Sequence, residues 1–225
     1  VVVSNVDAHH TFSDLIGENH IPAGFRSKLK GMRPSLSYFI LYLGIEGGAD
    51  GLPISNNEIF FEDSLQEEFD FLYKDRISEK APFYLLVPSK VNPSHAPAGK
   101  STLCLSCKAS YGFSPGWDRK TKEELSKRLI QKASAFIPDL ERRILVKIET
   151  TPKTIEQWTG NRWGAAYGWA QIPRQSGIYR LPRTAPIPNL YLTGHWTSPG
   201  GGIAGVVASG ELTAKAVLSR LEKGE

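Results

Sequence analysis

The sequence has few cysteines, no long apolar run and no strong excess of either charge, and each absence excludes a class of protein. The longest apolar runs, 38–43 and 83–87, are far shorter than the roughly 20 residues of a membrane-spanning helix. Lys and Arg total 27 against 23 for Asp and Glu, and no basic stripe gathers this excess, so no nucleic-acid partner is expected. No basic leader precedes the first apolar run, which predicts a cytoplasmic protein.

The two cysteines, Cys104 and Cys107, stand three residues apart in a segment that alternates like a β-strand. Side chains three apart on a strand point to opposite faces, which makes a disulfide or a shared metal awkward. A zinc site would also need four ligands, and the sequence supplies no second pair at a suitable spacing. We therefore interpret both cysteines as structural, and we expect neither a metal nor a redox centre.

Apolar residues make up 40% of the 225 residues and charged residues 22%, a globular composition that allows one large domain or two small ones. The apolar run 1–4 predicts a buried parallel strand, and 189–193 predicts another, followed by a glycine-rich loop and a helix over about 202–221. The two ends therefore indicate an α/β layer. The middle of the chain indicates an α+β fold with antiparallel strands, expected at 35–45, 82–88, 101–110 and 144–148.

Helix starts are marked by side chains that can accept backbone N–H groups. Asn5 or Asp7 can cap a first helix that Gly17 ends, and Pro22 can open a second one that ends near Gly31. Two capping boxes, 64–67 and 121–124, predict helices in the middle of the chain, and Thr151-Pro152 predicts one more.

The most distinctive segment is the glycine-rich run 200–205 between the last strand and the last helix. It matches G-x-G-x-x-G formally, but no strand follows the helix and the chain ends 20 residues after Gly205, so it fails as a dinucleotide fingerprint. Two interpretations remain for the run. The glycines either bring a ligand close to the positive end of a helix or allow close packing of helix against sheet.

Aromatic residues interleaved with glycines fill the segment 158–169, and such a cluster either fills a core or lines a pocket for a flat or long ligand. The histidines lie in loop or capping contexts and are expected at the surface. His9-His10 is the exception, because this pair follows the first strand and would face a cofactor there.

Three blocks of the sequence, 2–7, 151–168 and 189–210, together resemble the C-terminal half of phytoene desaturase-like flavoproteins, which include carotenoid desaturases, carotenoid isomerases and retinol saturase-like proteins. The resemblance implies the C-terminal part of a two-domain FAD/NAD(P)-binding flavoprotein, with an antiparallel-sheet substrate domain flanked by segments of the FAD domain. It places 1–16 and 183–225 in the FAD domain and 17–182 in the substrate domain. The family's N-terminal FAD-binding segment has no counterpart here, so we expect a fragment that is inactive and does not retain FAD by itself.

The resemblance also implies site residues. Gly194 and His195 fall where related flavoproteins place a glycine and an acidic residue that binds the ribityl chain, so the histidine departs from the pattern. The start of the last helix would approach the flavin ring through four further residues, Gly201, Gly202, Ile203 and Gly205. The substrate would be contacted by Trp163, Tyr167 and Trp169. No catalytic acid or base and no metal ligand is assigned.

The function implied by the resemblance is FAD-dependent desaturation or isomerisation of a carotenoid or another isoprenoid polyene, with hydride transfer to flavin N5. Two alternatives stay open: a flavin amine oxidase, and a non-catalytic isoprenoid-binding relative that has lost the flavin. A lipophilic substrate of this kind resides in lipid, so peripheral membrane contact is a further hypothesis.

Overall fold

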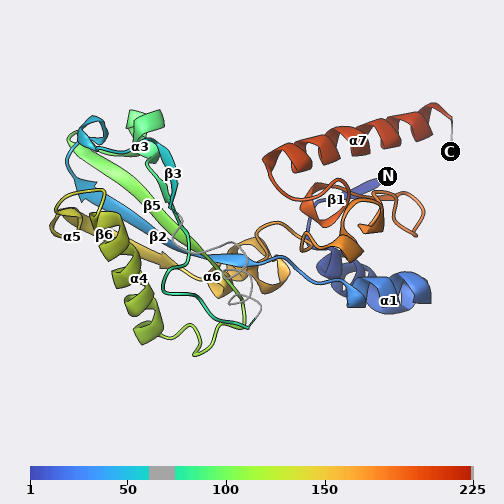
Figure 1. Ribbon diagram of the computed structural model, residues 1–225. Coiled ribbons are helices and arrows are strands. Elements are labelled where there is room, and N and C mark those ends of the chain that lie inside the picture. Colours follow the sequence, from blue (N-terminus) through green and yellow to red (C-terminus); the bar gives the residue numbers. More distant parts are fainter. Residues whose placement is uncertain (61–73, 224–225) are drawn as a thin grey trace. The chain divides into compact units, whose positions relative to one another are not determined.

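The computed structural model describes residues 1–60 and 74–223, and these form two compact units (Figure 1). Unit 1 combines Val1–Leu36 with Ile155–Glu225, and unit 2 is Ser37–Thr154. The helix expected from the capping box at 64–67 lies outside the described residues.

Unit 1 contains a parallel pair of short strands from opposite ends of the sequence. Strand β1, Val2–Ser4, pairs with β7, Leu190–Leu192, in the register Val2 to Leu190. The parallel pairing agrees with the expectation, and β7 is fully buried. The expected burial of β1 is wrong for the described residues, because Val2 is 62% exposed. Strand β1 pairs with β7 along one edge, and no other described strand pairs with the second edge of β1.

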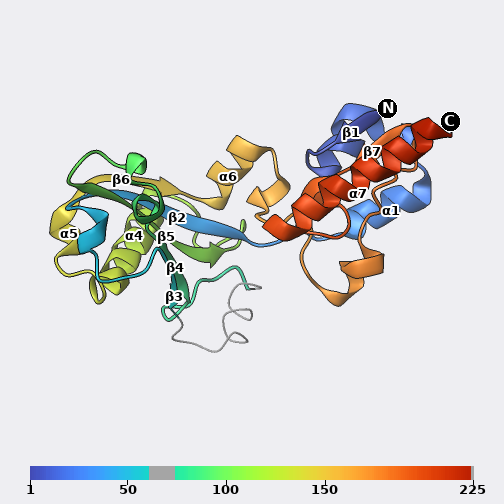
Figure 2. The same ribbon diagram turned by 90° about the horizontal axis from the view of Figure 1, so that it is seen from above.

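One long helix and several short helical segments accompany this pair in unit 1. Asp7 Oδ1 accepts the backbone N–H groups of His9 and His10 at 2.7 and 3.1 Å, which confirms its capping role. The last helix, α7, lies beside β7 (Figure 2). The helical segments that lie wholly in this unit are η1 His10–Gly17, η2 Glu18–His20, α1 Ala23–Gly31, η5 Arg162–Gly164, η6 Pro173–Gln175, η7 Gly177–Tyr179, η8 Gly194–Trp196 and α7 Ile203–Glu222.

Unit 2 is built on a five-stranded antiparallel sheet, as the middle of the sequence predicts. In the order β3-β4-β5-β2-β6, its strands are Asn57–Phe60, Phe83–Leu86, Lys100–Ala109, Ser37–Glu46 and Ile144–Thr150. Its helical segments are η3 Ala49–Gly51, α3 Pro88–Val91, η4 Pro93–His95, α4 Arg119–Ser134 and α5 Leu140–Arg143, and α6, Pro152–Thr159, begins in this unit.

One face of the sheet packs against α4 because every second residue of the strands is apolar. Phe39, Leu41 and Leu43 of β2 share this core with Leu125 and Leu129 of α4. Helix α4 begins two residues before the expected capping box. Asp118, not Thr121, is its N-cap, because the Asp118 carboxylate accepts the Thr121 N–H at 2.8 Å. At α6 the expected cap is confirmed, since the Thr151 hydroxyl accepts the Thr154 N–H at 3.3 Å.

The two units differ in extent from the domains expected from the resemblance. Residues 17–36 and 155–182 group with the chain ends in unit 1, although they were expected to join the middle. The segment 165–170 hydrogen-bonds to the segment 33–36, for example from Ala170 N to Arg33 O at 2.9 Å, which draws both segments into one unit. The assignment of FAD and substrate roles to parts of the chain stays a prediction.

Candidate functional site

The carboxyl ends of β1 and β7 meet at one edge of the parallel pair. The loops that follow them approach closely: a Cβ on Gly194 would lie 2.1 Å from the Asn5 side-chain oxygen, and the φ of +83° at Gly194 also favours glycine. In open α/β sheets, ligands bind outside the carboxyl ends of parallel strands. We define the carboxyl-edge site as the loop residues Gly194 and His195 together with residues 200–205 at the start of α7.

The glycine-rich run combines the two interpretations that the sequence leaves open. A Cβ on Gly201 would lie 2.6 Å from the Tyr167 carbonyl oxygen, and one on Gly205 would lie 2.6 Å from the Gly200 carbonyl oxygen. These two glycines are therefore required for packing. Gly202 has a φ of +88°, but the space where its Cβ would stand is open. Only Gly202 leaves room for a ligand against the backbone.

The N-terminus of α7 begins beside that open space. Ile203 is strongly exposed, and the Gly202 N-cap offers no side chain to the first N–H groups of the helix. Unpaired N–H groups and the helix dipole give such an end about half a positive charge. It suits an acceptor-rich or anionic edge of a ligand.

His195 is half-buried at the same edge, and its Nε2 lies 3.4 Å from the side-chain oxygen of Asn161. Burial lowers the pKa of His195 below 6.5, and the neighbouring Arg180 guanidinium lowers it further. The imidazole is thus held neutral near pH 7. It can take part in one hydrogen bond as donor and another as acceptor, but it does not supply the negative charge of a carboxylate at this position.

This burial predicts a pH dependence of stability. Because the folded-state pKa of His195 is below its unfolded value of 6.5, the unfolded chain binds the proton more readily. The stability contributed by the neutral imidazole is complete above pH 6.5 and declines as the pH falls through and below that value. We expect His195→Gln to flatten the change in unfolding free energy between pH 7 and 5, measured by urea denaturation. An unchanged slope in the variant would contradict the assignment.

Three residues that sequence reasoning did not place in the site hold its loops together. Asp7 Oδ2 accepts the Arg162 N–H at 2.8 Å, and the Asn161 side-chain oxygen accepts the Trp196 indole N–H at 3.0 Å. Arg180 is 2% exposed. Its Nε donates to Thr197 O at 2.9 Å, and its Nη2 donates to the carbonyls of His195 and Tyr167 at 2.6 and 3.3 Å.

The expected substrate residues differ in exposure. Trp169 is fully buried in the core of unit 1, where its indole N–H donates to Trp196 O at 2.8 Å, so it is a core residue of this unit. Trp163 and Tyr167 are exposed. Their contact with a substrate stays a prediction, and the position of Trp169 gives that role no support.

Of the two histidines expected to face a cofactor, His9 is the more buried one. Its ring meets the Trp169 ring edge-on at 5.4 Å between centroids, and burial lowers its pKa below 6.5. His10 pairs instead with Asp14 at the surface, at 2.9 Å. No structural observation gives either ring a catalytic role.

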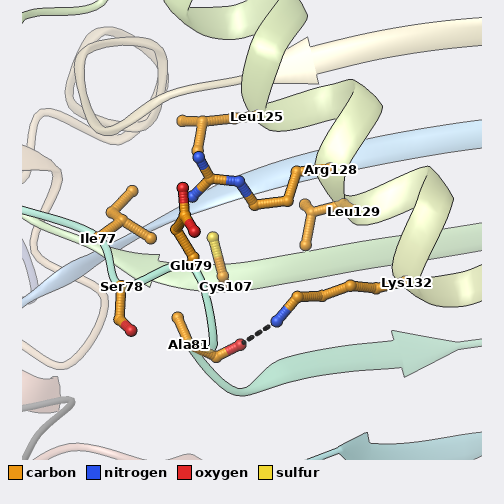
Figure 3. Close-up of a pocket in the computed structure, with 9 residues that line it drawn as sticks. All are labelled: Ile77, Ser78, Glu79, Ala81, Cys107, Leu125, Arg128, Leu129 and Lys132. Carbon is orange, nitrogen blue, oxygen red and sulfur yellow. Dashed lines mark hydrogen bonds between the residues drawn. The ribbon is translucent and has the colours of Figure 1, made fainter. Parts of the chain in front are cut away.

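As predicted, Cys104 and Cys107 lie on opposite faces of one strand, β5. Burial raises the pKa of the Cys104 thiol to about 11, which keeps it unreactive at neutral pH. Figure 3 shows Cys107 between the segment 77–81 and α4, where Lys132 donates to Ala81 O at 3.2 Å. The pocket there has a volume of about 10 Å³, too little for more than one water. Among the described residues, no group of His, Cys, Asp and Glu could hold a metal.

Unit 2 carries a second feature, an apolar sheet face that the described residues leave uncovered. It lies opposite the α4 side, and cross-strand partners such as Tyr42 and Ile148 share it. We call this the open sheet face. Its exposed members are Tyr42, Ile59, Leu86, Val146 and Ile148. Apolar patches of this kind mark ligand or interaction surfaces.

Two solved structures share the fold of this chain. An oxidoreductase from Methanosarcina mazei matches with a TM-score of 0.51, at 12% identity, over 96% of this chain and 42% of the other. A protein from Pyrococcus furiosus matches with a TM-score of 0.52, at 15% identity, over 96% and 40%. At these identities the likeness shows the fold alone.

Residues 55–218 match the flavin containing amine oxidoreductase family, and the chain belongs to that family. It is 30% identical to a phytoene desaturase (neurosporene-forming) of Rhodobacter capsulatus over 96% of this chain and 43% of the relative. It is 27% identical to a 4,4'-diapolycopene oxygenase of Methylomonas over 99% and 44%, and 30% identical to a carotenoid 3,4-desaturase of Haloarcula japonica over 81% and 37%. The chain spans less than half the length of these relatives.

Family membership implies FAD as the cofactor. The carboxyl-edge site fits a flavin in two respects: Gly202 leaves open space against the backbone, and the α7 N-terminus has no side-chain cap. At Gly194, by contrast, the Asn5 side chain already occupies the space beside the backbone. The Gly194 N–H is also in use, because it donates to the Ser209 hydroxyl at 3.1 Å. No described helix is long and apolar enough to cross a membrane.

Proposed function

We propose that this chain is the C-terminal part of an FAD-dependent oxidoreductase that acts on a carotenoid or another isoprenoid polyene. The open sheet face carries this proposal, because its exposed side chains Leu86, Val146 and Ile148 form an apolar surface that suits a long hydrocarbon better than an amine. The names of the curated relatives support the same substrate class. In this assignment unit 1 contributes to the FAD domain, and unit 2 contributes the substrate surface.

When bound, FAD supplies the hydride acceptor for desaturation or isomerisation. The residues of this chain hold and orient the reactants. The N–H groups at the start of α7, beside Gly202, stabilise negative charge that develops on a neighbouring acceptor edge. The apolar side chains of the open sheet face, such as Tyr42 and Ile148, bind the polyene and exclude water from it.

We assign the remaining FAD contacts to a segment outside this chain, since the described residues contain no complete phosphate-binding βαβ unit. The exposed apolar side chains of β1, such as Val2, and of α7, such as Val207, suit coverage by that segment. Peripheral membrane contact remains part of the proposal, because the substrate must be taken from lipid.

The test uses the full-length protein that contains this chain. We expect the purified protein to carry flavin, seen as absorbance in the blue, and to consume a polyene such as phytoene in detergent or liposomes. Turnover of amines without turnover of polyenes would assign the protein to the amine oxidases. Absence of flavin from folded protein would favour the non-catalytic relative.

A pair of matched variants tests the role of the open sheet face. Ile148→Asp places a charge on that face, and we expect it to reduce kcat/KM for the polyene by about tenfold or more, because the charge must be desolvated against the hydrocarbon. Val91→Asp makes an equivalent change on exposed α3, away from the face, and should leave kcat/KM within about twofold. Equal effects of the two variants would remove the face from the substrate site.

A further inference from the structure

Unit 1 contains a hollow whose lining includes none of the residues assigned to the carboxyl-edge site, although Arg180 borders both. It has a volume of about 420 Å³, many times the roughly 30 Å³ that one water occupies in the liquid. Its lining residues are Lys28, Gly177, Ile178, Arg180, Pro182, Arg183, Thr184 and Ser198. Three of these are cationic, two carry hydroxyl groups, and none is acidic.

The three cations have no counter-charge within the described residues. No ion pair joins a described carboxylate to Lys28, Arg180 or Arg183. Arg180 is 2% exposed and uses its donors on carbonyl groups, which do not neutralise it. Burial lowers its pKa to about 10, the direction expected for a cation without a compensating anion.

Two guanidinium nitrogens of this group are also buried without a hydrogen-bond partner among the described residues. They are Nη1 of Arg180 and Nε of Arg183. A buried donor without a partner costs free energy, and the cost is larger when the donor is charged. Both residues line the same hollow, so one ligand could satisfy the charge of both.

We propose that this hollow is a binding site for a phosphate-bearing anion, held by Lys28, Arg180 and Arg183. Guanidinium groups bind phosphate oxygens through paired N–H donors, and an ammonium group adds a compact charge. The hydroxyls of Thr184 and Ser198 supply further donors. The inference does not depend on flavin binding or on the polyene substrate.

The phosphate could come from a soluble ester or from a lipid headgroup. Ile178 lines the hollow and is 91% exposed, so an apolar side chain stands beside the cations at its mouth. In a lipid complex, the Ile178 side chain can contact the acyl chains while the cations hold the phosphate of the headgroup. The phosphate chemistry is the same for both sources, and the experiment separates them.

The experiment measures binding to the full-length protein at low salt, with three probes: inorganic phosphate, glycerol 1-phosphate, and vesicles that contain phosphatidylglycerol. Calorimetry follows the soluble probes and co-sedimentation follows the vesicles. We expect saturable binding that Lys28→Gln and Arg183→Gln each weaken by about tenfold, the value of one charge-assisted hydrogen bond. Binding of the soluble probes assigns a soluble ester, and binding of vesicles alone assigns a headgroup.

Lys30→Gln is the matched control. Lys30 lies on the same helix, α1, but its Nζ contacts the Glu18 carboxylate at 2.7 Å and it does not line the hollow. Its removal changes the net charge equally and should alter binding by less than about twofold. The proposal is overturned if no probe binds saturably, or if the three variants weaken binding to the same extent, which would indicate general charge attraction.

Discussion

Replacing Gly202 with valine in the full-length protein is expected to weaken FAD binding by about a hundredfold. A Cβ at this position would occupy the open space that the proposed flavin edge needs, and it would separate the ring from the N–H groups of α7. A preorganised donor to a charged edge contributes about 3 kcal/mol, which corresponds to the stated loss. Flavin fluorescence titration of the folded protein measures the effect.

Two variants separate loss of contact from loss of fold. The φ of +88° at Gly202 strains any residue with a Cβ, so Gly202→Val is also expected to lower the unfolding free energy by about 1–3 kcal/mol. Gly202→Ala has nearly the same strain with a smaller side chain, and it should weaken FAD binding less. Gly210 lies inside α7, and the space around it is open, so Gly210→Val should leave the flavin affinity unchanged. Wild-type affinity in folded Gly202→Val protein would remove this loop from the flavin site.

The second large effect is expected at Arg180. Its Nε and Nη2 join the carbonyl groups of Tyr167, His195 and Thr197, which lie on two separate loops of unit 1. Arg180→Met leaves the buried Thr197 carbonyl and the part-buried carbonyls of Tyr167 and His195 without their donor. Each such group costs about 1–3 kcal/mol, so we expect the unfolding free energy to fall by about 3 kcal/mol. For a chain of this size the midpoint of thermal unfolding should fall by about 10 °C.

Arg183→Met is the control for Arg180→Met in phosphate-free buffer. The Nε of Arg183 has no hydrogen-bond partner in the described part of the chain, so loss of its side chain removes no comparable link between loops. Its unfolding midpoint should stay within about 2 °C of the wild type, or rise. If Arg180→Met shows the same small change, then the guanidinium does not hold the two loops, and the geometry of the site rests on other contacts.

Local sequence patterns were sufficient to predict most elements of the fold. The alternation of apolar residues in β2 and β5 defines one buried face, because side chains of a strand alternate between faces. Asp7 and Thr151 are followed by helical segments because their side-chain oxygens accept nearby N–H groups. These interactions join residues only two or three apart. The start of α4 was missed because two adjacent segments could both supply a cap, and Asp118 does so.

The sequence by itself also predicted the candidate site, because the glycine-rich run lies between a buried strand and a long helix. Only the tertiary structure decided which glycines are needed for packing and which one leaves space for a ligand. Gly201 and Gly205 meet carbonyl oxygens, whereas Gly202 faces open space. The same holds for Arg180, whose partner carbonyls lie 13 to 17 residues away and carry no sequence signal. The burial of Trp169 likewise depends on contacts across the whole of unit 1. The sequence shows that an aromatic ring is present at this position, but it does not show which residues surround the ring.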